Sequence, residues 1–157
     1  MAIIRLTKEF TFEAAHALEG YDGPCREIHG HSYRLFVTVK GRPSADEADP
    51  KCGMVLDFGL LKRIVQEEIV SHFDHALVLR NTADTALREV LRERFRNIVE
   101  VAYQPTCEHM LADFADRIRR RLPAGVTLHS LRLHETATSY AEWFAEDNGN
   151  LELKIKN

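Results

Sequence analysis

The stretch that decides the fold is HGHSYRLFVTVK, residues 29–40. Its odd-numbered positions carry histidine, tyrosine and aliphatic side chains, and its even-numbered positions carry mainly polar or charged ones. A period of two predicts a half-buried strand. The stretch IRLTKEFTFEAAH, residues 4–16, alternates in the same way, and a loop rich in Gly and Pro separates the two. We therefore expect an antiparallel pair. One parity of this pair carries His16, Phe12, His29, His31, Tyr33 and Leu35.

Helical periodicity follows the two strands. Asp57 is a suitable N-cap for a helix with an apolar stripe at residues 61, 64, 65 and 69, and a second helix is expected from about Thr106 to Pro123. A short extra helix is expected near residues 87–95. Alternation returns at residues 131–133, 140–144 and 151–155. The order predicts an α+β fold, with two main helices on one face of an antiparallel sheet.

Composition limits the class of protein. The 157 residues, 45% hydrophobic and 29% charged, are typical of one globular domain spanning residues 1–157. A net charge of −3 gives no general attraction to nucleic acid or an anionic membrane, and no apolar run is long enough to span a bilayer. The three cysteines, at positions 25, 52 and 107, are odd in number and widely spaced, which favours a reduced cytoplasmic setting.

Three of the eight histidines are expected to share one strand face. His29 and His31 are two residues apart, and His16 continues the apolar parity of the partner strand. Three imidazoles on two rigid strands are the ligand set of a catalytic zinc site, with one position left for water or substrate. A single histidine on an apolar face is more often a hydrogen-bonded core residue, so the prediction depends on all three together.

Other side chains are candidates for proton transfer or binding. Cys25 lies in the loop four residues before His29, where a nearby metal would favour its thiolate, although most lone cysteines are inert. Asp74 precedes His75 and could fix its tautomer, but adjacent side chains often diverge. Glu135 continues an apolar strand parity and could bind an amidine-like ring edge or simply reach solvent.

Together these residues resemble the 6-pyruvoyltetrahydropterin synthase family over nearly the whole chain. The motifs, in order, are F-E-A-A-H (12–16), C-R-E-I-H-G-H (25–31), D-H (74–75), P-T-x-E (105–108) and H-E-T (134–136). The spacing C-x₃-H-G-H resembles the bacterial branch, the 6-carboxytetrahydropterin synthases of queuosine biosynthesis.

The resemblance implies a tunnelling fold (T-fold) with a four-stranded antiparallel sheet and two helices. It implies zinc on His16, His29 and His31. Subunits would form a homohexamer, a dimer of trimers, with active sites at subunit interfaces. The substrate would be 7,8-dihydroneopterin triphosphate, which is converted to 6-carboxy-5,6,7,8-tetrahydropterin with loss of triphosphate and acetaldehyde.

The resemblance also implies residue roles. Cys25 would be the general acid/base, and Asp74 and His75 would complete a relay from a neighbouring subunit. Glu135 would anchor the pterin, and Thr106 of the P-T-x-E motif is a further candidate for substrate binding.

The sequence departs from the simple bacterial pattern in three places. Glu27 gives the variant C-x-E-x-H-G-H, similar to a subgroup that makes 6-hydroxymethyl-7,8-dihydropterin for folate synthesis, although a loop acid could equally face solvent. His109 stands where relatives often have Asn, and Arg80–Gln104 is long enough to cover the site or alter subunit contacts.

Other products and classes stay open at this point. The same substrate could yield 6-pyruvoyltetrahydropterin instead. In another class, the fold could serve a zinc-stabilised binding or assembly protein. The groups available for proton transfer favour the enzyme, and the groups that hold the triphosphate are not identified by the sequence.

Overall fold

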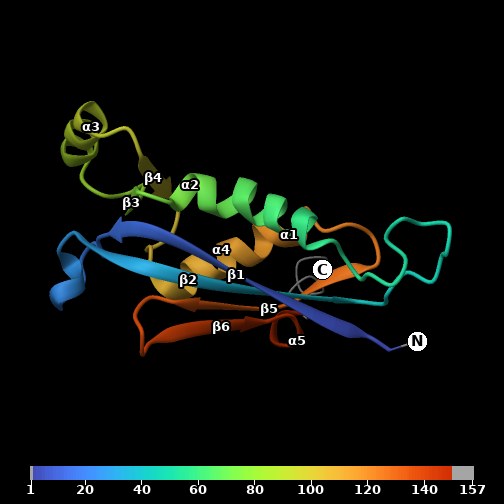
Figure 1. Cartoon of the computed structure of the whole chain (residues 1–157). Coiled ribbons are helices and arrows are strands. Elements are labelled where there is room, and N and C mark those ends of the chain that lie inside the picture. Colours follow the sequence, from blue (N-terminus) through green and yellow to red (C-terminus); the bar gives the residue numbers. More distant parts are fainter. Residues whose placement is uncertain (1, 150–157) are drawn as a thin grey trace, which may run out of the picture.

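A single mixed sheet organises the molecule (Figure 1). The computed structural model describes residues 2–149, and in that part the sheet has six strands in the order β4-β3-β1-β2-β5-β6. The strands are β1 (Ile4–His16), β2 (His29–Gly41), β3 (Ala76–Arg80), β4 (Ile98–Val101), β5 (Val126–His134) and β6 (Tyr140–Phe144).

The long β1–β2 pair sets the register of the sheet. Its antiparallel pairing runs from Ile4↔Gly41 to His16↔His29, so the last residue of β1 lies beside the first residue of β2. The predicted antiparallel pair is therefore confirmed. The loop between the strands contains a short 3₁₀ turn, η1 (Pro24–Arg26), and is closed by a hydrogen bond from the Leu18 amide to the Cys25 carbonyl.

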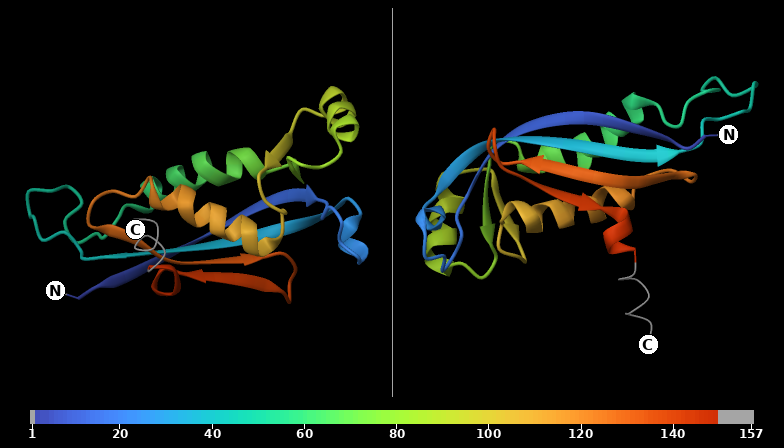
Figure 2. Two further views of the ribbon diagram at one scale, coloured as in Figure 1. Left: turned by 180° about the vertical axis from the view of Figure 1, so that it is seen from behind. Right: turned by 90° about the horizontal axis from the view of Figure 1, so that it is seen from below.

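Both long helical segments lie on one side of the sheet (Figure 2). The first consists of α1 (Phe58–Val65), a π-helical turn η2 (Gln66–Val70) and α2 (Ser71–Phe73), and the second is α4 (Cys107–Arg119). Two shorter helices, α3 (Thr85–Arg94) and α5 (Ala145–Asn148), complete the described elements. The Asp57 carboxylate caps α1 by accepting from the Gly59 amide, as the sequence predicts.

Aromatic rings fill the space between the helices and the sheet. Phe12 stacks on Tyr33 at a centroid distance of 5.0 Å, and Phe73 meets Phe114 edge to face at 4.9 Å. All four rings are buried and belong to one continuous apolar cluster. Helix and sheet are therefore fixed to each other by close apolar packing at the end of the sheet that carries the histidines.

The sheet differs from the expected four antiparallel strands. Two short strands extend it beyond β1: β3 pairs with β1 in parallel over Ala76–Val78, and β4 pairs in parallel with β3. Their sequences, ALVLR and IVEV, are short and do not alternate clearly, so the period-2 criterion misses them. The third predicted C-terminal strand, residues 151–155, lies outside the described residues.

The predicted extra helix is present as α3, and it packs in an unexpected way. Arg88 pairs with the Glu100 carboxylate of β4 at 2.9 Å, and Arg92 contacts the same carboxylate. The apolar side chains of Val90 and, just beyond the helix, Phe95 are more than half exposed. Charged contacts therefore attach α3 to the sheet edge, while apolar groups face outward.

Every helix within residues 2–149 is too short or too polar to traverse a lipid bilayer.

Candidate metal centre and active site

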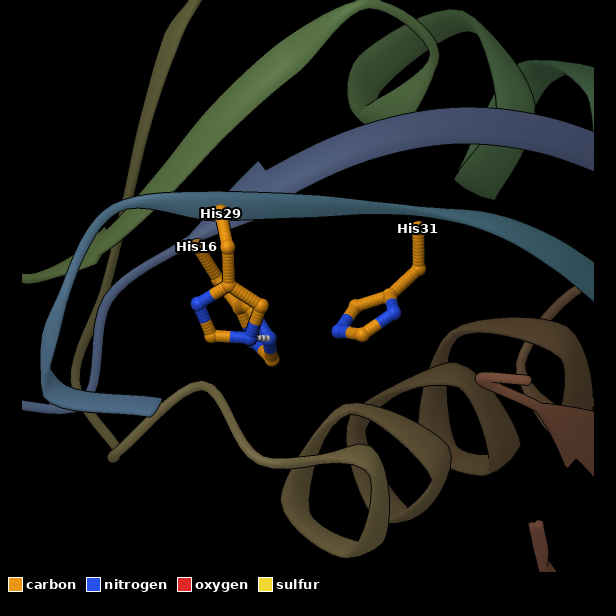
Figure 3. Close-up of side chains that lie close together, drawn as sticks. All are labelled: His16, His29 and His31. Carbon is orange, nitrogen blue, oxygen red and sulfur yellow. Dashed lines mark hydrogen bonds between the residues drawn. The ribbon is translucent and has the colours of Figure 1, made fainter. Parts of the chain in front are cut away.

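Three histidines converge at one end of the sheet (Figure 3). His16 ends β1 and His29 begins β2, and their backbones are paired in the antiparallel register. His31 lies two residues further along β2 on the same face. One nitrogen from each ring lies within 4.8 Å of the other two, so the face predicted from the alternation is the face on which the rings meet.

Backbone carbonyls hold two of these rings in defined tautomers. The Nδ1 of His16 lies 2.7 Å from the Pro105 carbonyl, and the Nδ1 of His29 lies 2.7 Å from the Glu27 carbonyl. A carbonyl only accepts, so each Nδ1 carries the hydrogen and each Nε2 is left with a lone pair. Metal-binding histidines are oriented by such contacts.

The lone pairs point toward one another. The Nε2 atoms of His16 and His29 are 3.1 Å apart, and in these tautomers neither has a hydrogen to share. The Nε2 of His31 is buried and has no hydrogen-bond partner. Two unprotonated nitrogens this close repel each other unless a cation lies between them, and the unpartnered Nε2 of His31 lies beside them. The residues present therefore fit a bound metal ion.

Burial keeps two of the imidazoles neutral. Desolvation is the main cause that lowers the pKa of His16, which is 2% exposed, below the ordinary value of 6.5, and it also lowers the pKa of His31. Neutral imidazole is the form that binds metal, and three imidazole ligands are typical of catalytic zinc. The donor set alone fits zinc as well as other first-row metals.

Glu135 faces the same three-histidine cluster. Its Oε1 lies 3.5 Å from the Nε2 of His16 and 3.6 Å from the Nε2 of His31, and the hydroxyl of Tyr33 donates to it across 3.4 Å. Burial, reinforced by this carboxylate, raises the pKa of Tyr33, so the phenol stays protonated and a donor. The carboxylate is half-buried, next to the turn that links β5 to β6.

The loop residues Cys25 and Glu27 differ in exposure. Cys25, on the 3₁₀ turn, is an unpaired, half-buried thiol, and the Glu27 side chain is exposed. Among residues 2–149, no hydrogen bond or ion pair joins either side chain to the histidines. The contact that Glu27 does make is through its backbone carbonyl, to His29.

Asp74 and His75 form a pair of their own at the start of β3. The Nδ1 of His75 lies 3.0 Å from the Asp74 carboxylate, which also accepts from the Glu13 amide at 2.9 Å. The latter bond is the main cause that lowers the pKa of Asp74. His75 has a left-handed backbone, with φ at 58°, and its side chain is 78% exposed. No described contact joins this pair to the three-histidine cluster.

A groove of about 780 Å³ opens beside His75. Its lining includes Gly30 and Ser32 of β2, on the parity opposite to the buried residues, together with Leu91 and Phe95 at α3. The long segment between Arg80 and Gln104 therefore borders this groove, which His31 also lines. Within residues 2–149, no hydrogen bond or ion pair joins that segment to the three histidines.

Thr106 begins α4 and supports the cluster indirectly. Its hydroxyl caps the helix by accepting from the His109 amide, as expected for an N-cap. The His109 ring, whose role the sequence left open, lies 3.2 Å from the Gln104 carbonyl through Nδ1. These contacts fix the turn that presents the Pro105 carbonyl to His16.

Two contributors to the site were missed in the sequence. Tyr33 lies on the parity of the histidines, which is the signal that could have identified it as a contact for Glu135. The Pro105 carbonyl meets His16 across 89 residues of chain, and no sequence pattern reveals a backbone acceptor at that separation.

The fold and the site define an α+β protein with a cluster of three histidines, suited to a metal ion, at one end of its sheet. A family model described as 6-pyruvoyl tetrahydropterin synthase matches residues 5–146, and the chain belongs to that family.

Similar proteins agree with this assignment. A 6-carboxy-5,6,7,8-tetrahydropterin synthase of Haemophilus influenzae is 32% identical over 90% of this chain and 99% of its own. A dihydroneopterin monophosphate aldolase of Pyrococcus furiosus is 30% identical over 83% of this chain and 89% of its own. The structure of the Caenorhabditis elegans 6-pyruvoyl tetrahydropterin synthase superposes with a TM-score of 0.65 at 22% identity, over 92% of this chain and 96% of that one. This last likeness supports the T-fold.

Proposed function

We propose that the protein is a zinc-dependent lyase that converts 7,8-dihydroneopterin triphosphate to 6-carboxy-5,6,7,8-tetrahydropterin, with release of triphosphate and acetaldehyde, in queuosine biosynthesis. The observation that carries the proposal is the cluster of three inward-facing imidazole nitrogens in a member of this family. The name of the Haemophilus influenzae relative supports the choice of product.

Zinc held by His16, His29 and His31 would act as a Lewis acid that polarises the oxygens of the substrate side chain. The protein's own groups orient the ligand rings and transfer protons. The Pro105 and Glu27 carbonyls keep two of the ligand rings in the binding tautomer. Cys25, half-buried on the loop before β2, would be the general acid/base.

Substrate binding is assigned to the end of β5 and the start of α4. The Glu135 carboxylate would accept from the N–H edge of the pterin, with Thr106 as a further contact. The half-buried position of Glu135 beside Tyr33 supports this role, because a carboxylate there is partly shielded from water.

The Asp74–His75 pair would act in the site of a second copy of the chain. Its carboxylate–imidazole contact is formed, yet it is not joined to the three histidines of its own chain, and the His75 side chain is exposed. Assembly as a dimer of trimers, with active sites between subunits, would bring such a pair to a neighbouring metal. The proposal also includes a reduced cytoplasmic compartment, which the three unpaired cysteines support.

A second product is favoured by one residue. Glu27 adds a carboxylate two residues from His29, and the Pyrococcus furiosus relative is named an aldolase. A second acid/base near the metal could direct the same substrate to 6-hydroxymethyl-7,8-dihydropterin for folate synthesis. The 6-pyruvoyl product is the remaining alternative.

Product identification with zinc-loaded protein tests the proposal. The protein is incubated with 7,8-dihydroneopterin triphosphate, and the pterins are separated and identified by mass. We expect the 6-carboxy product and acetaldehyde, and loss of turnover in Cys25→Ala. Loss of only a hydroxymethyl product in Glu27→Ala would establish the second activity. Absence of any turnover would refute the enzyme.

Zinc removal separates the enzyme from a zinc-stabilised binding or assembly protein. The apolar cluster between helices and sheet is continuous without a metal, so the fold should survive chelation while activity is lost. If the chain unfolds on chelation and has no turnover when reloaded, the assembly role is the better explanation.

A further inference from the structure

The Glu135 carboxylate has an unusual set of neighbours. Two imidazoles and one phenol hydroxyl lie around it, and among residues 2–149 no lysine or arginine forms an ion pair with it. A partly desolvated carboxylate is costly without a counter-charge or strong donors. Tyr33 supplies a single donor at 3.4 Å, which is a long contact.

Neither imidazole makes a hydrogen bond to the carboxylate. The Nδ1 of His16 is committed to the Pro105 carbonyl, so its Nε2, the atom nearest to Glu135, has no hydrogen to give. The Nε2 of His31 is buried and has no hydrogen-bond partner. At His16, carboxylate and imidazole therefore face each other with lone pairs on both sides at 3.5 Å, and the Nε2 of His31 lies 3.6 Å from the same carboxylate oxygen.

From this arrangement we infer that Glu135 is a fourth ligand of the metal in the substrate-free protein. In a tetrahedral zinc site with bonds of about 2.0–2.2 Å, neighbouring ligand atoms lie about 3.3–3.6 Å apart. The Glu135 oxygen stands at that separation from two of the three imidazole nitrogens. The Glu135 carboxylate approaches from the side of His16 and His31. Rotation of its half-buried side chain brings the oxygen into the fourth position of the tetrahedron.

The same carboxylate then has two partners in turn. This step rests on the proposed function. The N–H edge of an arriving pterin draws Glu135 away from the metal and opens the fourth coordination position for the substrate. A catalytic metal needs such an exchangeable position. Closure by Glu135 would keep that position from other anions until a ring with donor groups is present.

Cobalt spectroscopy and zinc affinity test the ligation without an activity assay. Wild type, Glu135→Gln and Glu135→Ala are loaded with Co²⁺, and the visible d–d bands report the ligand set. Zinc affinity is measured by competition with a chromophoric chelator. Glu89→Gln, which removes an exposed carboxylate on α3, is the matched control. Circular dichroism checks that each variant is folded.

We expect both Glu135 variants to change the cobalt bands and to weaken zinc binding by at least about 10-fold, whereas the control changes neither. Addition of 7,8-dihydroneopterin to cobalt-loaded wild type should shift the bands. Identical spectra and affinities in wild type and Glu135 variants would overturn the inference while leaving the three-histidine centre intact. His31→Ala, which lacks one of the three imidazoles, serves as the reference for a disrupted centre. If wild type, like His31→Ala, fails to bind cobalt, the metal centre itself is refuted, and the inference with it.

Discussion

Replacement of Asp74 by Asn removes one negative charge from the pair that the carboxylate forms with His75. The Asp74 carboxylate accepts from the Glu13 amide at 2.9 Å and contacts the His75 Nδ1 at 3.0 Å. Hydrogen bonds to a charged group contribute about 1.5–3 kcal/mol each when shielded. The Asp74 side chain is 39% exposed, so solvent screening reduces the expected loss to about 1 kcal/mol in total. For a domain of this size, that corresponds to a drop in Tm of about 2–4 °C.

The pH dependence gives the prediction its sign. Contacts to the charged form lower the pKa of Asp74 below its ordinary value of 3.8. Its stabilising contribution is therefore complete above the unfolded-state pKa and is lost as pH falls through the folded-state pKa. Wild type should lose this contribution on acidification below about pH 4, whereas Asp74→Asn should not.

Urea unfolding at pH 7 and at about pH 3 measures the difference. The free-energy gap between wild type and Asp74→Asn should be about 1 kcal/mol at pH 7 and clearly smaller at the acidic pH. Asp116→Asn, which removes a carboxylate that is 61% exposed, is the control and should show no such gap. A gap that is equal at both pH values would refute the charge-based account of this pair.

Three further substitutions test the packing around the site. Phe114→Ala should lower the free energy of unfolding by about 3–5 kcal/mol in urea titrations, because the ring is fully buried, and a loss below 1 kcal/mol would contradict this packing. Glu100→Gln should lower the free energy of unfolding by about 2 kcal/mol because Arg88 loses its charged partner. Amide hydrogen exchange should accelerate in α3 before it does in the core, and uniform acceleration would argue against a local attachment of α3. Thr106→Ala should lower the free energy of unfolding by about 1 kcal/mol in thermal unfolding, because α4 loses its N-cap. Thr106→Ser should recover this stability, and no recovery would exclude the hydroxyl as the cause.

Alternation in the sequence predicted the main pair of strands and the shared face of three histidines. Side chains two apart on a strand point the same way, so His29 and His31 had to project together once β2 formed. The caps Asp57 and Thr106 were likewise predictable, because an N-cap bonds only to residues two or three positions further along the chain.

Tertiary structure alone decided how the face becomes a site. The register that sets His16 beside His29, the Pro105 carbonyl on His16 and the approach of Glu135 all join segments far apart in sequence. The short parallel strands β3 and β4 were missed for a related reason, since few residues carry their pattern and pairing with β1 stabilises them.

The difference between the two kinds of information is one of range. Periodicity, capping and turn chemistry depend on neighbours within a few residues, so the sequence by itself determined the long β1–β2 pair, the main helices and the side from which the imidazoles project. The orientation of the His16 ring, its neutral state and the position of Glu135 depend on burial and on contacts made by distant segments. Those contacts exist only after the helices close over the sheet, and they turn three histidines on a strand face into a site suited to a metal ion.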